Sequence, residues 1–378
     1  MILPCQRDKF DIPSDVTYLD CAYMSPLPKQ TLLAGEAGLH KKAQPWRITG
    51  DDFFDLGEQL RGQMAQMVSA KTLDFALIPS VSYGMSVIAK NLNLNKGAEV
   101  LVLAQQFPSN IYPWLELCQQ QAANLNMVSA KSGQSWTEAV LAAICPQTAL
   151  LALPHVHWID GGLLDLVAIG KAARAVGAVL VLDLTQSLGA VPFNVREVDP
   201  DFFVVANYKW LLGPYSTGFL YAAKRQQNGT PLEQCWQSRK GAENFAGLTQ
   251  YTDQLSAGAS RYDMGERSNF AALPAVAASL AQLLDWGVKN ITETLGQTTK
   301  TLAKIAQQHG LHSASTGPRA PHYLSLQIPK NAPPDLLIRA RAQGVYFSHR
   351  GERLRITPHL WVNDADMTRF DQVLDSLF

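Results

Sequence analysis

Seven short runs of apolar residues punctuate the first two-thirds of the chain, and amphipathic stretches of helical length separate most of them. Continuous apolar strands that alternate with helices are typical of a mostly parallel β-sheet covered by helices on both faces. The apolar runs predict strands at 75–78, 99–104, 125–128, 149–153, 179–184, 202–206 and 218–222. The amphipathic stretches predict helices at 83–92, 111–121, 136–144 and 163–176.

The last two of these runs break the parallel pattern. Only a short, glycine-containing link joins residues 202–206 to 218–222, and it is too short for the helical crossover that a parallel pair requires. We therefore expect these two strands to pair antiparallel. Beyond residue 230 the chain becomes polar, and residues 231–265 are predicted to form an irregular connection over the functional site.

The C-terminal third predicts a smaller unit in which helices and strands mix. The expected elements are helices at 273–288, 292–308, 334–343 and 364–377, the last capped by Asn363 or Asp364, and strands at 323–328, 345–348 and 354–356. The predicted fold is therefore α/β, with a large domain built on a mostly parallel seven-stranded sheet between helices and a smaller α+β C-terminal domain. We assign residues 1–25 to an N-terminal segment that packs with the small domain, 26–262 to the large domain and 263–378 to the small domain.

The composition argues against several classes of protein. Lys+Arg and Asp+Glu both number 32, and no basic run with interleaved aromatics occurs, so we expect no nucleic-acid partner. No run of 18 or more apolar residues occurs, so no membrane span is expected, and the charged, proline-containing start does not resemble a signal peptide. The five cysteines are scattered without CxxC spacing, which argues against a zinc site and a secreted disulfide framework. We expect a cytoplasmic protein that binds no metal.

Lys209 is the most informative single residue, because it lies within the apolar segment 206–214. Burying a lysine is costly unless the amine is neutral or covalently occupied. One explanation is a Schiff base to the aldehyde of pyridoxal phosphate (PLP), and the alternative is an ordinary surface lysine in a loop. A PLP site also needs an acid for the pyridine nitrogen, a phosphate cradle, a ring stack and a clamp for the substrate carboxylate. The chain offers a candidate for each.

Asp183 closes an apolar strand, at the edge where open α/β sheets bind ligands. Its carboxylate is a candidate partner for the pyridine nitrogen, which would keep the ring protonated and make it an electron sink. Gln186, three residues on, is a candidate hydrogen-bond donor to the phenolic oxygen of the ring. The alternative is structural: Asp183 caps a helix and Gln186 completes a capping box.

Residues 80–84, Ser-Val-Ser-Tyr-Gly, follow a strand and open a helix. Small residues and exposed backbone N–H groups at a helix start can bind phosphate, although serines cap ordinary helices as well. No Walker-type GxxxxGKS or GxxxxGKT segment occurs, and no GxGxxG follows an early strand, so a nucleotide loop and a dinucleotide fold are not predicted. Phe107 is a candidate to stack on the pyridine ring or, alternatively, an ordinary core residue.

Arg355 alternates with apolar residues on the strand at 354–356 and is a candidate for a bidentate pair with a substrate carboxylate. An exposed strand arginine is the alternative, and Arg350 is a second candidate for the same role. His155 and His157 are two residues apart, so on a strand they share one face. No third metal ligand stands near them, and we expect one to face the cofactor ring and the other to be structural.

Taken together, these segments resemble the class V aminotransferase family, which includes cysteine desulfurases, selenocysteine lyases, kynureninase and isopenicillin-epimerase-like proteins. They span nearly the whole chain in family order, which makes the match specific although no single segment is. The matching segments are Tyr-Leu-Asp-Cys-Ala-Tyr at 18–23 with Pro26, residues 80–84, Gln-Phe-Pro-Ser-Asn at 106–110 with Pro113 and Trp114, Asp-Leu-Thr-Gln at 183–186, Tyr208-Lys209, and Leu-Arg-Ile at 354–356.

The resemblance implies a fold-type-I PLP enzyme, usually a homodimer whose two active sites lie near the subunit interface. It implies that Lys209 forms the Schiff base, that Asp183 pairs with the pyridine nitrogen and that Gln186 lies near the phenolic oxygen. The phosphate contacts that it implies come from Val81, Ser82 and Tyr208.

Two features are similar to the kynureninase-like branch in particular. Phe107 stands where the family often has a stacking histidine, and Tyr208 stands where desulfurases have a histidine before the lysine. The resemblance places Arg355 on the substrate carboxylate and Asn269 near the dimer-interface side of the site, as a second substrate contact. Desulfurases carry a nucleophilic cysteine shortly before the carboxylate-binding arginine, and residues 348–353 contain none, so persulfide chemistry is not expected.

We therefore expect an enzyme that binds an amino acid as an external aldimine and reaches a quinonoid after Lys209 removes the α-proton. An aminotransferase or lyase is the first prediction, and a kynureninase-like hydrolase acting on an aromatic, ketone-bearing substrate is the second. Two further alternatives are a PLP-binding protein without turnover and an unrelated α/β enzyme in which Lys209 is structural. Replacing Lys209 with alanine separates the last alternative from the others, because only the PLP readings require a covalently bound cofactor.

Overall fold

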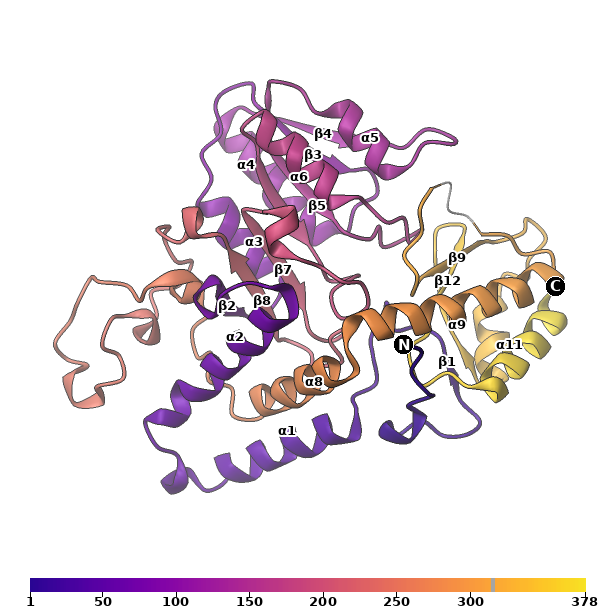
Figure 1. Cartoon of the computed structure of the whole chain (residues 1–378), viewed down its shortest axis with the longest axis horizontal. Helices are drawn as coiled ribbons and strands as arrows, with labels where there is room; N and C mark the ends of the chain where they lie inside the picture. The colour runs from indigo at the N-terminus through magenta and orange to yellow at the C-terminus, as the bar shows by residue number, and fades with distance from the viewer. Residues whose placement is uncertain (314–316) are drawn as a thin grey trace.

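A seven-stranded sheet forms the centre of the large domain in the computed structural model, which describes residues 1–313 and 317–378 (Figure 1). Its strands are β2 (Phe75–Ile78), β3 (Glu99–Leu103), β4 (Asn124–Val128), β5 (Thr148–Pro154), β6 (Val179–Asp183), β7 (Phe202–Ala206) and β8 (Gly218–Ala222). The order across the sheet is β2-β8-β7-β6-β5-β3-β4. β8 pairs antiparallel with β7, as predicted, and also with β2, while the remaining pairs are parallel.

Both faces of the sheet are buried, which explains why its strands are continuous apolar runs. On β7, for example, Phe203 and Val205 point into one core and Phe202 and Val204 into the other. Helices α3 (Val81–Lys90) and α4 (Tyr112–Gln121) cover the second core, and α2 (Asp55–Val68), α5 (Trp136–Ala143) and α6 (Leu166–Ala175) contribute to the first. The short helix α7 (Val195–Val198) follows β6. The predicted mostly parallel sheet between helices is confirmed.

Two helices precede the first strand of this sheet and were not predicted. These are α1 (Lys29–Lys42) and α2, and both pack against α8 (Ala272–Trp286). Side chains of α8 belong to the same core as the sheet. The chain changes direction at Gly287, whose φ is +75°, and then enters α9 (Val288–Gln308). Ile291 and Leu295 near the start of α9 still pack in the core of the sheet, and Leu302 and Ala306 pack in the core of the small domain. The domain boundary predicted near residue 263 stays a prediction.

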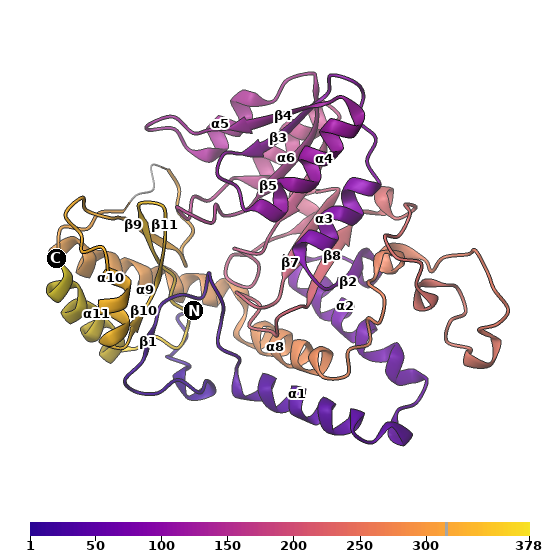
Figure 2. The same cartoon turned by 180° about the vertical axis from the view of Figure 1, so that it is seen from behind.

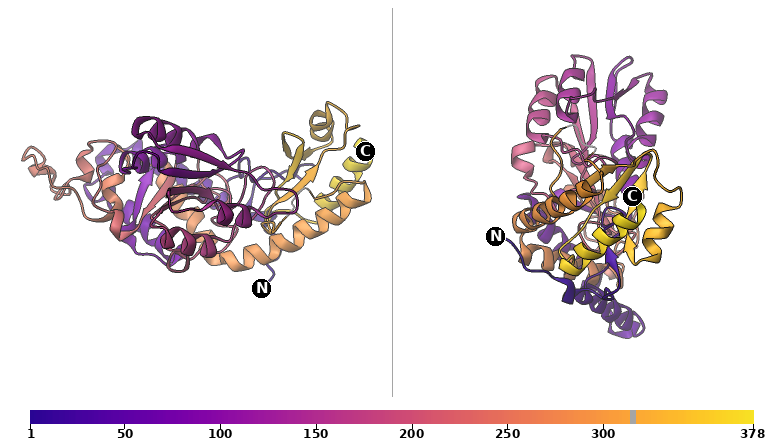
Figure 3. Two further views of the ribbon diagram at one scale, coloured as in Figure 1. Left: turned by 90° about the horizontal axis from the view of Figure 1, so that it is seen from above. Right: turned by 90° about the vertical axis from the view of Figure 1, so that its right-hand side faces the viewer.

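The segment 231–265 does not cover the functional site, contrary to our prediction. It contains short 3₁₀ turns, and Figures 1 and 3 show that its first part projects from the end of the large domain. Trp236 and Phe245 pack on Phe53 and Phe54 just before α2, with ring centroids 5.4–6.4 Å apart. These aromatic contacts hold the segment beside the start of α2, away from the pocket described below.

The small domain is built on a three-stranded antiparallel sheet of order β11-β12-β9 (Figure 2). Its elements are β9 (Leu324–Gln327), α10 (Leu336–Ala342), β11 (Ser348–Arg350), β12 (Arg353–Ile356) and α11 (Asp364–Leu377). Asn363 caps α11 by accepting a hydrogen bond from the Asp366 backbone N–H. It is one of the two residues that were predicted as this cap. None of the helices in the described ranges combines the length and the apolarity needed to cross a bilayer.

The single strand predicted at 345–348 is wrong, because its residues join two sheets. Val345–Tyr346 forms β10 and pairs in parallel with β1 (Thr17–Tyr18) of the N-terminal segment, whereas Ser348 begins β11. The N-terminal segment thus lies against the small domain, and its residues 20–24 continue toward the pocket.

Candidate active site

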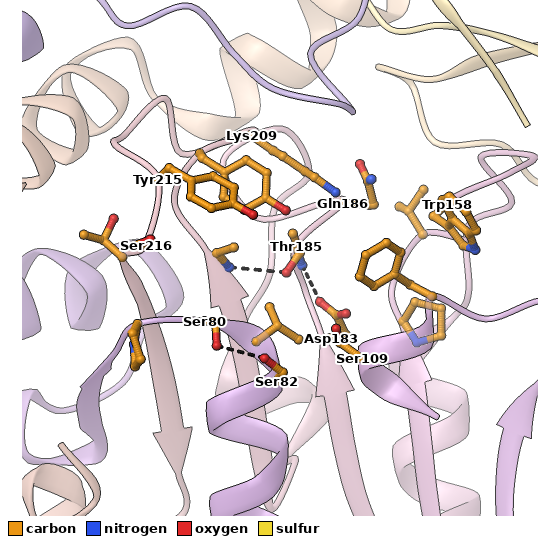
Figure 4. A pocket seen from close by; sticks show the side chains of 18 of the residues that line it. Ser80, Ser82, Ser109, Trp158, Asp183, Thr185, Gln186, Lys209, Tyr215 and Ser216 are labelled. Carbon is orange, nitrogen blue, oxygen red and sulfur yellow. Dashed lines mark hydrogen bonds between the residues drawn. The ribbon is translucent and has the colours of Figure 1, made fainter. Parts of the chain in front are cut away.

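A pocket opens at the carboxyl edge of the large sheet, where several loops converge (Figure 4). We call it the inner pocket. The loops that follow β2, β3, β5, β6 and β7 line it, together with the residues that precede β8. Because the carboxyl ends of parallel strands meet at one edge, side chains from distant parts of the sequence face one another here. Its lining includes Ser80, Val81, Ser82, Phe107, Ser109, Trp158, Asp183, Thr185, Gln186, Tyr208, Lys209, Tyr215 and Thr217.

Lys209 lies in the loop after β7 and is 8% exposed. In Figure 4 its amine lies above Thr185 and Asp183. Burial lowers the pKa of Lys209 to about 8, because the charged form is desolvated, and the carboxylate of Asp183 opposes this shift. The Nζ atom is 5.6 Å from the centre of the Phe107 ring and 5.5 Å from that of Tyr208. The lysine is therefore buried, and its amine loses its proton more easily than that of an ordinary lysine.

Asp183 is buried at the end of β6 and accepts a hydrogen bond from the Thr185 backbone N–H at 2.9 Å. Burial raises the pKa of its carboxyl group, and hydrogen bonds from Thr185 and the charge of Lys209 oppose this rise. No helix begins at residue 183 or 184, so the alternative of an ordinary helix cap does not apply. Gln186 donates to the Ala22 carbonyl at 3.1 Å and accepts from Trp210 Nε1 at 3.0 Å, so its amide is already fixed.

The predicted phosphate cradle is a helix start. Ser80 caps α3 by accepting from the Tyr83 N–H at 3.1 Å, and its hydroxyl lies 2.9 Å from that of Ser82. The first N–H groups of a helix have no partner within the helix, and its dipole attracts anions. Val81 and Ser82 supply such groups beside the pocket. The rings of Tyr208 and Tyr215, 4.6 Å apart, lie on the opposite loop.

Neither histidine after β5 faces the pocket. Pro154, Val156 and Trp158 line it, so the alternate residues His155 and His157 point away. His155 packs on Phe193, and burial lowers its pKa to about 4. His157 contacts Asp160 at 3.1 Å and stacks near Trp136. The expectation that one histidine faces the cofactor ring is therefore wrong, and both are structural.

A second cavity, which we call the outer pocket, adjoins the first. It shares Phe107, Trp158, Tyr208, Lys209 and Tyr215 with the inner pocket. Its other walls come from the N-terminal segment (Ala22, Tyr23 and Met24) and from the small domain (Arg350 and Arg355). The two pockets therefore form one site that runs from the sheet to the small domain.

Arg355 is 1% exposed and is held by several hydrogen bonds. Its Nε and Nη2 atoms donate to Ser348 Oγ at 3.1 and 2.8 Å, and its Nη1 donates to the Trp158 carbonyl at 3.2 Å. Ser348 Oγ in turn donates to Asp20, whose carboxylate lies 3.7 Å from Arg355. Arg355 is therefore not the exposed strand arginine of the alternative interpretation, and it faces the site.

Asn269, like the two histidines, lines neither pocket. It is exposed, and its side chain accepts hydrogen bonds from the N–H groups of Ala271 and Ala272 at the start of α8. Its predicted substrate contact at a subunit interface stays a prediction. The described residues contain no group of three or more His, Cys, Asp or Glu side chains arranged to hold a metal ion.

Three of the lining residues to which sequence reasoning gave no role are Thr185, Trp158 and Tyr215. Thr185 lies between Asp183 and Gln186, Trp158 follows β5, and Tyr215 precedes β8. The rule that ligands bind at the carboxyl ends of parallel strands could have identified the first two. Tyr215 precedes an antiparallel strand, and only the position of β8 inside the sheet brings it to this edge.

The whole arrangement matches a known family. Residues 17–368 match the model of the class-V aminotransferases. The chain belongs to the class-V aminotransferase family. This membership confirms the predicted family and the predicted cofactor, PLP.

Several curated relatives in this family carry different activities. Kynureninase of Geobacillus thermodenitrificans is 25% identical over 322 residues, which cover 81% of this chain and 74% of that protein. An uncharacterized aminotransferase of Bacillus subtilis, YcbU, is 24% identical over 312 residues, 82% of this chain and 80% of that protein. A probable cysteine desulfurase of Methanothermobacter thermautotrophicus is 28% identical over 224 residues, 56% of this chain and 55% of that protein.

Solved structures share the fold over nearly the whole chain. The apo cysteine desulfurase from Thermococcus onnurineus NA1 has a TM-score of 0.86 at 17% identity and covers 100% of this chain and 99% of its own. The cystine C-S lyase C-DES, in complex with cysteine persulfide, has a TM-score of 0.87 at 17% identity and covers 96% and 98%. Another structure of C-DES carries glycine covalently linked to its PLP cofactor. At this identity the likeness confirms the predicted fold-type-I architecture alone.

Proposed function

We propose that the chain is an aminotransferase or lyase that acts on the α-carbon of an amino acid. The observation that carries this proposal is the amine of Lys209, whose pKa burial lowers and which lies in one site with the Asp183 carboxylate and the guanidinium of Arg355. Burying a lysine costs free energy, so its presence at the sheet edge indicates a chemical role.

The lining of the inner pocket fits PLP. Lys209 suits the aldehyde, Asp183 the pyridine nitrogen, and the first N–H groups of α3 with the Ser80 and Ser82 hydroxyls suit the phosphate. Phe107 lies beside Lys209 and suits a ring face. When bound, PLP draws electrons from the α-carbon of an attached amino acid and so weakens the bonds to that carbon.

Lys209 is suited to move the α-proton. A general base works best when its pKa lies near the operating pH, and burial brings the pKa of Lys209 to about 8. The aromatic rings of Phe107 and Tyr208 flank its amine and limit access of water. Released from the cofactor, the Lys209 Nζ atom can accept the proton and later return it. Return of the proton to the carbon that comes from the PLP aldehyde would give transamination, whereas loss of a substituent from the substrate β-carbon would give elimination.

The cysteines support a mechanism without a persulfide on the enzyme. None of the described residues that line either pocket is a cysteine. Cys21 lies behind the site, with its Sγ atom 3.8 Å from the Lys209 carbonyl oxygen, and it is fully buried. Burial raises the pKa of this thiol well above its ordinary value, which keeps it protonated and unreactive. We therefore propose that the reaction differs from that of the desulfurases with a nucleophilic cysteine.

A kynureninase-like hydrolase is the second candidate. The kynureninase of G. thermodenitrificans covers 81% of the chain, and the aromatic side chains of Phe107, Trp158 and Tyr208 would suit an aromatic substrate. Release of anthranilate from kynurenine would support this candidate, whereas formation of a 2-oxo acid from another amino acid would support the first. The homodimer that the resemblance implies and the cytoplasmic location expected from the composition stay predictions.

Visible absorbance of the purified protein tests the proposal. We expect an absorbance band of bound PLP that borohydride abolishes, with the reduced cofactor attached to Lys209 in a peptide map. Lys209→Ala should lose this attachment, whereas Lys224→Ala, which changes an exposed lysine, should keep it. A protein that stays colourless after PLP is added would overturn the proposal, and so would attachment at any other lysine.

A further inference from the structure

Three positively charged side chains line the outer pocket, and none of the described residues that line it is acidic. These are Lys209 on the large domain and Arg350 and Arg355 on the small domain. If Lys209 holds the cofactor, the two guanidinium groups remain to receive the substrate. An amino acid has one α-carboxylate, which needs one of them.

Arg355 has room for one carboxylate. A guanidinium has five N–H donors, and three hydrogen bonds to Ser348 and Trp158 already occupy part of this set. Two donors remain, which matches the two oxygens of a single carboxylate. A second negative group on the substrate must therefore find another partner.

Arg350 is placed to be that partner. β11 and β12 pair antiparallel with Ser348 opposite Arg355, so Arg350, two residues after Ser348, is a diagonal neighbour of Arg355 on the same face. Both guanidinium groups lie against the ring of Trp158, at 5.7 Å for Arg350 and 5.9 Å for Arg355. The indole N–H of Trp158 is fixed by the Gln105 carbonyl, so the ring is a fixed support for both.

Arg350 also lacks a counter-charge of its own. Its Nη1 atom donates to the carbonyl of His349, and within residues 1–313 and 317–378 no carboxylate lies at ion-pair distance from its guanidinium. The charge of Arg355 disfavours the charged form of Arg350, and Asp20, which favours it, is already bonded to Ser348. Arg353, directly opposite Arg350 on β12, is a further cation. Holding a half-buried cation beside a like charge is unfavourable until an anion binds between them.

We propose that the substrate is an amino acid with a second carboxylate on its side chain, in which Arg355 binds the α-carboxylate and Arg350 the side-chain carboxylate. The inference rests on the proposed function, because it assumes that the amino group is held at the Lys209 end of the site. Arg350 is then the residue that determines specificity, and neutral amino acids bind without its help.

Matched pairs of ligands test this inference on the holoenzyme. Aspartate and asparagine, like glutamate and glutamine, have nearly the same shape and differ in charge. Their dissociation constants can be measured from the change in absorbance of the bound cofactor. We expect at least one acidic amino acid to bind about 10- to 100-fold more tightly than its amide, because a hydrogen-bonded charge contributes that much in a partly buried site.

Variants identify the residue responsible. Arg350→Gln should bring the ratio of the dissociation constants of amide and acid to near one. Arg350→Lys should keep part of this ratio, because the charge remains but the paired N–H donors of the guanidinium are lost. Arg341→Gln, an exposed arginine on α10, removes the same charge outside the site and should keep the full ratio. The amount of cofactor reduced onto Lys209 shows whether each variant is folded.

The outcomes separate the two proposals. Equal binding of acids and amides by the unaltered holoenzyme would overturn the inference and leave the proposed function standing. Tighter binding of kynurenine than of aspartate and glutamate would overturn it too. If Arg350→Gln keeps the full ratio of dissociation constants, Arg350 does not bind the side-chain carboxylate. If no amino acid changes the spectrum of the bound cofactor, the proposed function fails and the inference with it.

Discussion

The two walls of the candidate active site are built in different ways. On the large-domain wall, Asp183 and Lys209 follow directly from the ends of the adjacent strands β6 and β7. On the small-domain wall, Arg355 is held by Ser348, which itself bonds to Asp20, 328 residues away in the sequence. The first geometry follows from the sheet, whereas the second depends on contacts between the N-terminal segment, the hairpin β11–β12 and the loop after β5.

This difference in construction indicates that the two walls have different roles. The large-domain wall carries the groups that suit the cofactor, and the small-domain wall carries the groups that face a substrate. Changes in the first wall should lower the rate with every amino acid. Changes in the second should alter which amino acid binds. The predictions below test this division, from the largest expected effect to the smallest.

Replacing Asp183 with asparagine should have the largest effect. The substitution keeps the shape of a buried side chain and removes the charge that favours a protonated pyridine nitrogen. We expect kcat to fall by about 10²- to 10³-fold, the typical loss when one preorganised electrostatic partner is removed. Steady-state kinetics with one acidic and one neutral amino acid would measure the fall, and both substrates should suffer equally.

A control for this variant lies on the same domain. Asp165 is exposed and caps α6 through the Ala168 N–H, so Asp165→Asn removes a carboxylate outside the pockets. It should leave kcat unchanged. A loss in Asp183→Asn confined to acidic substrates would contradict the division between the walls, and an unchanged rate would remove Asp183 from the chemistry.

The strands of the large sheet were predictable because they are continuous apolar runs, whereas helix α1 was not, because a small residue makes its contact. Helix α1 was missed because Gly38, rather than a large apolar residue, faces α8: a Cβ at this position would lie 1.9 Å from the Phe270 carbonyl oxygen. Leu32 and Leu39 of the same helix are exposed. The helix therefore lacks the apolar periodicity on which a sequence-based prediction rests.

The site shows the same limit. A strand end identified Asp183, because position along a parallel strand fixes which edge a residue occupies, and the apolar segment 206–214 identified Lys209. The two-residue spacing of His155 and His157 correctly put them on one face, but both faces of β5 are buried, so the sequence could not tell which face meets the pocket. The link between Arg355 and Trp158 joins residues 197 apart, and no local pattern indicates it.

The stability of the cofactor-free protein should depend on pH through Lys209. Its pKa is about 8 in the fold, against 10.5 for an ordinary lysine, so between these values the unfolded chain holds a proton that the folded chain has lost. Stability therefore rises with pH across this window, by about 3 kcal/mol. We expect the free energy of unfolding of the unaltered protein to rise by that amount relative to Lys209→Met, measured by denaturant titration from pH 7.5 to 10.5.

The same measurement tests whether the walls interact. Burial is the main cause of the lowered pKa of Lys209, and the charge of Arg355 contributes in the same direction across the site. In Arg355→Gln the pH range over which stability rises should be narrower, because the pKa of Lys209 moves back toward that of an ordinary lysine. If the pH range over which stability rises is as wide in Arg355→Gln as in the unaltered protein, the two walls are electrostatically independent. If the difference in unfolding free energy between the unaltered protein and Lys209→Met does not change with pH, Lys209 is not desolvated.

The smallest expected effect compares two helix caps, one at the site and one remote from it. Ser80 caps α3 beside the inner pocket, and Asn363 caps α11 in the small domain. Replacing either with alanine should lower the free energy of unfolding by about 1 kcal/mol, the usual contribution of such a cap.

Only Ser80→Ala should also weaken PLP binding, by about 5- to 10-fold, since it removes a hydroxyl and loosens the N–H groups of the cradle. Equal PLP affinity in the two variants, measured by equilibrium dialysis, would mean that the start of α3 is an ordinary capped helix. A loss confined to Ser80→Ala would show that the same local signal, a polar cap before a helix, acquires a binding role only where the sheet places it beside Asp183 and Lys209.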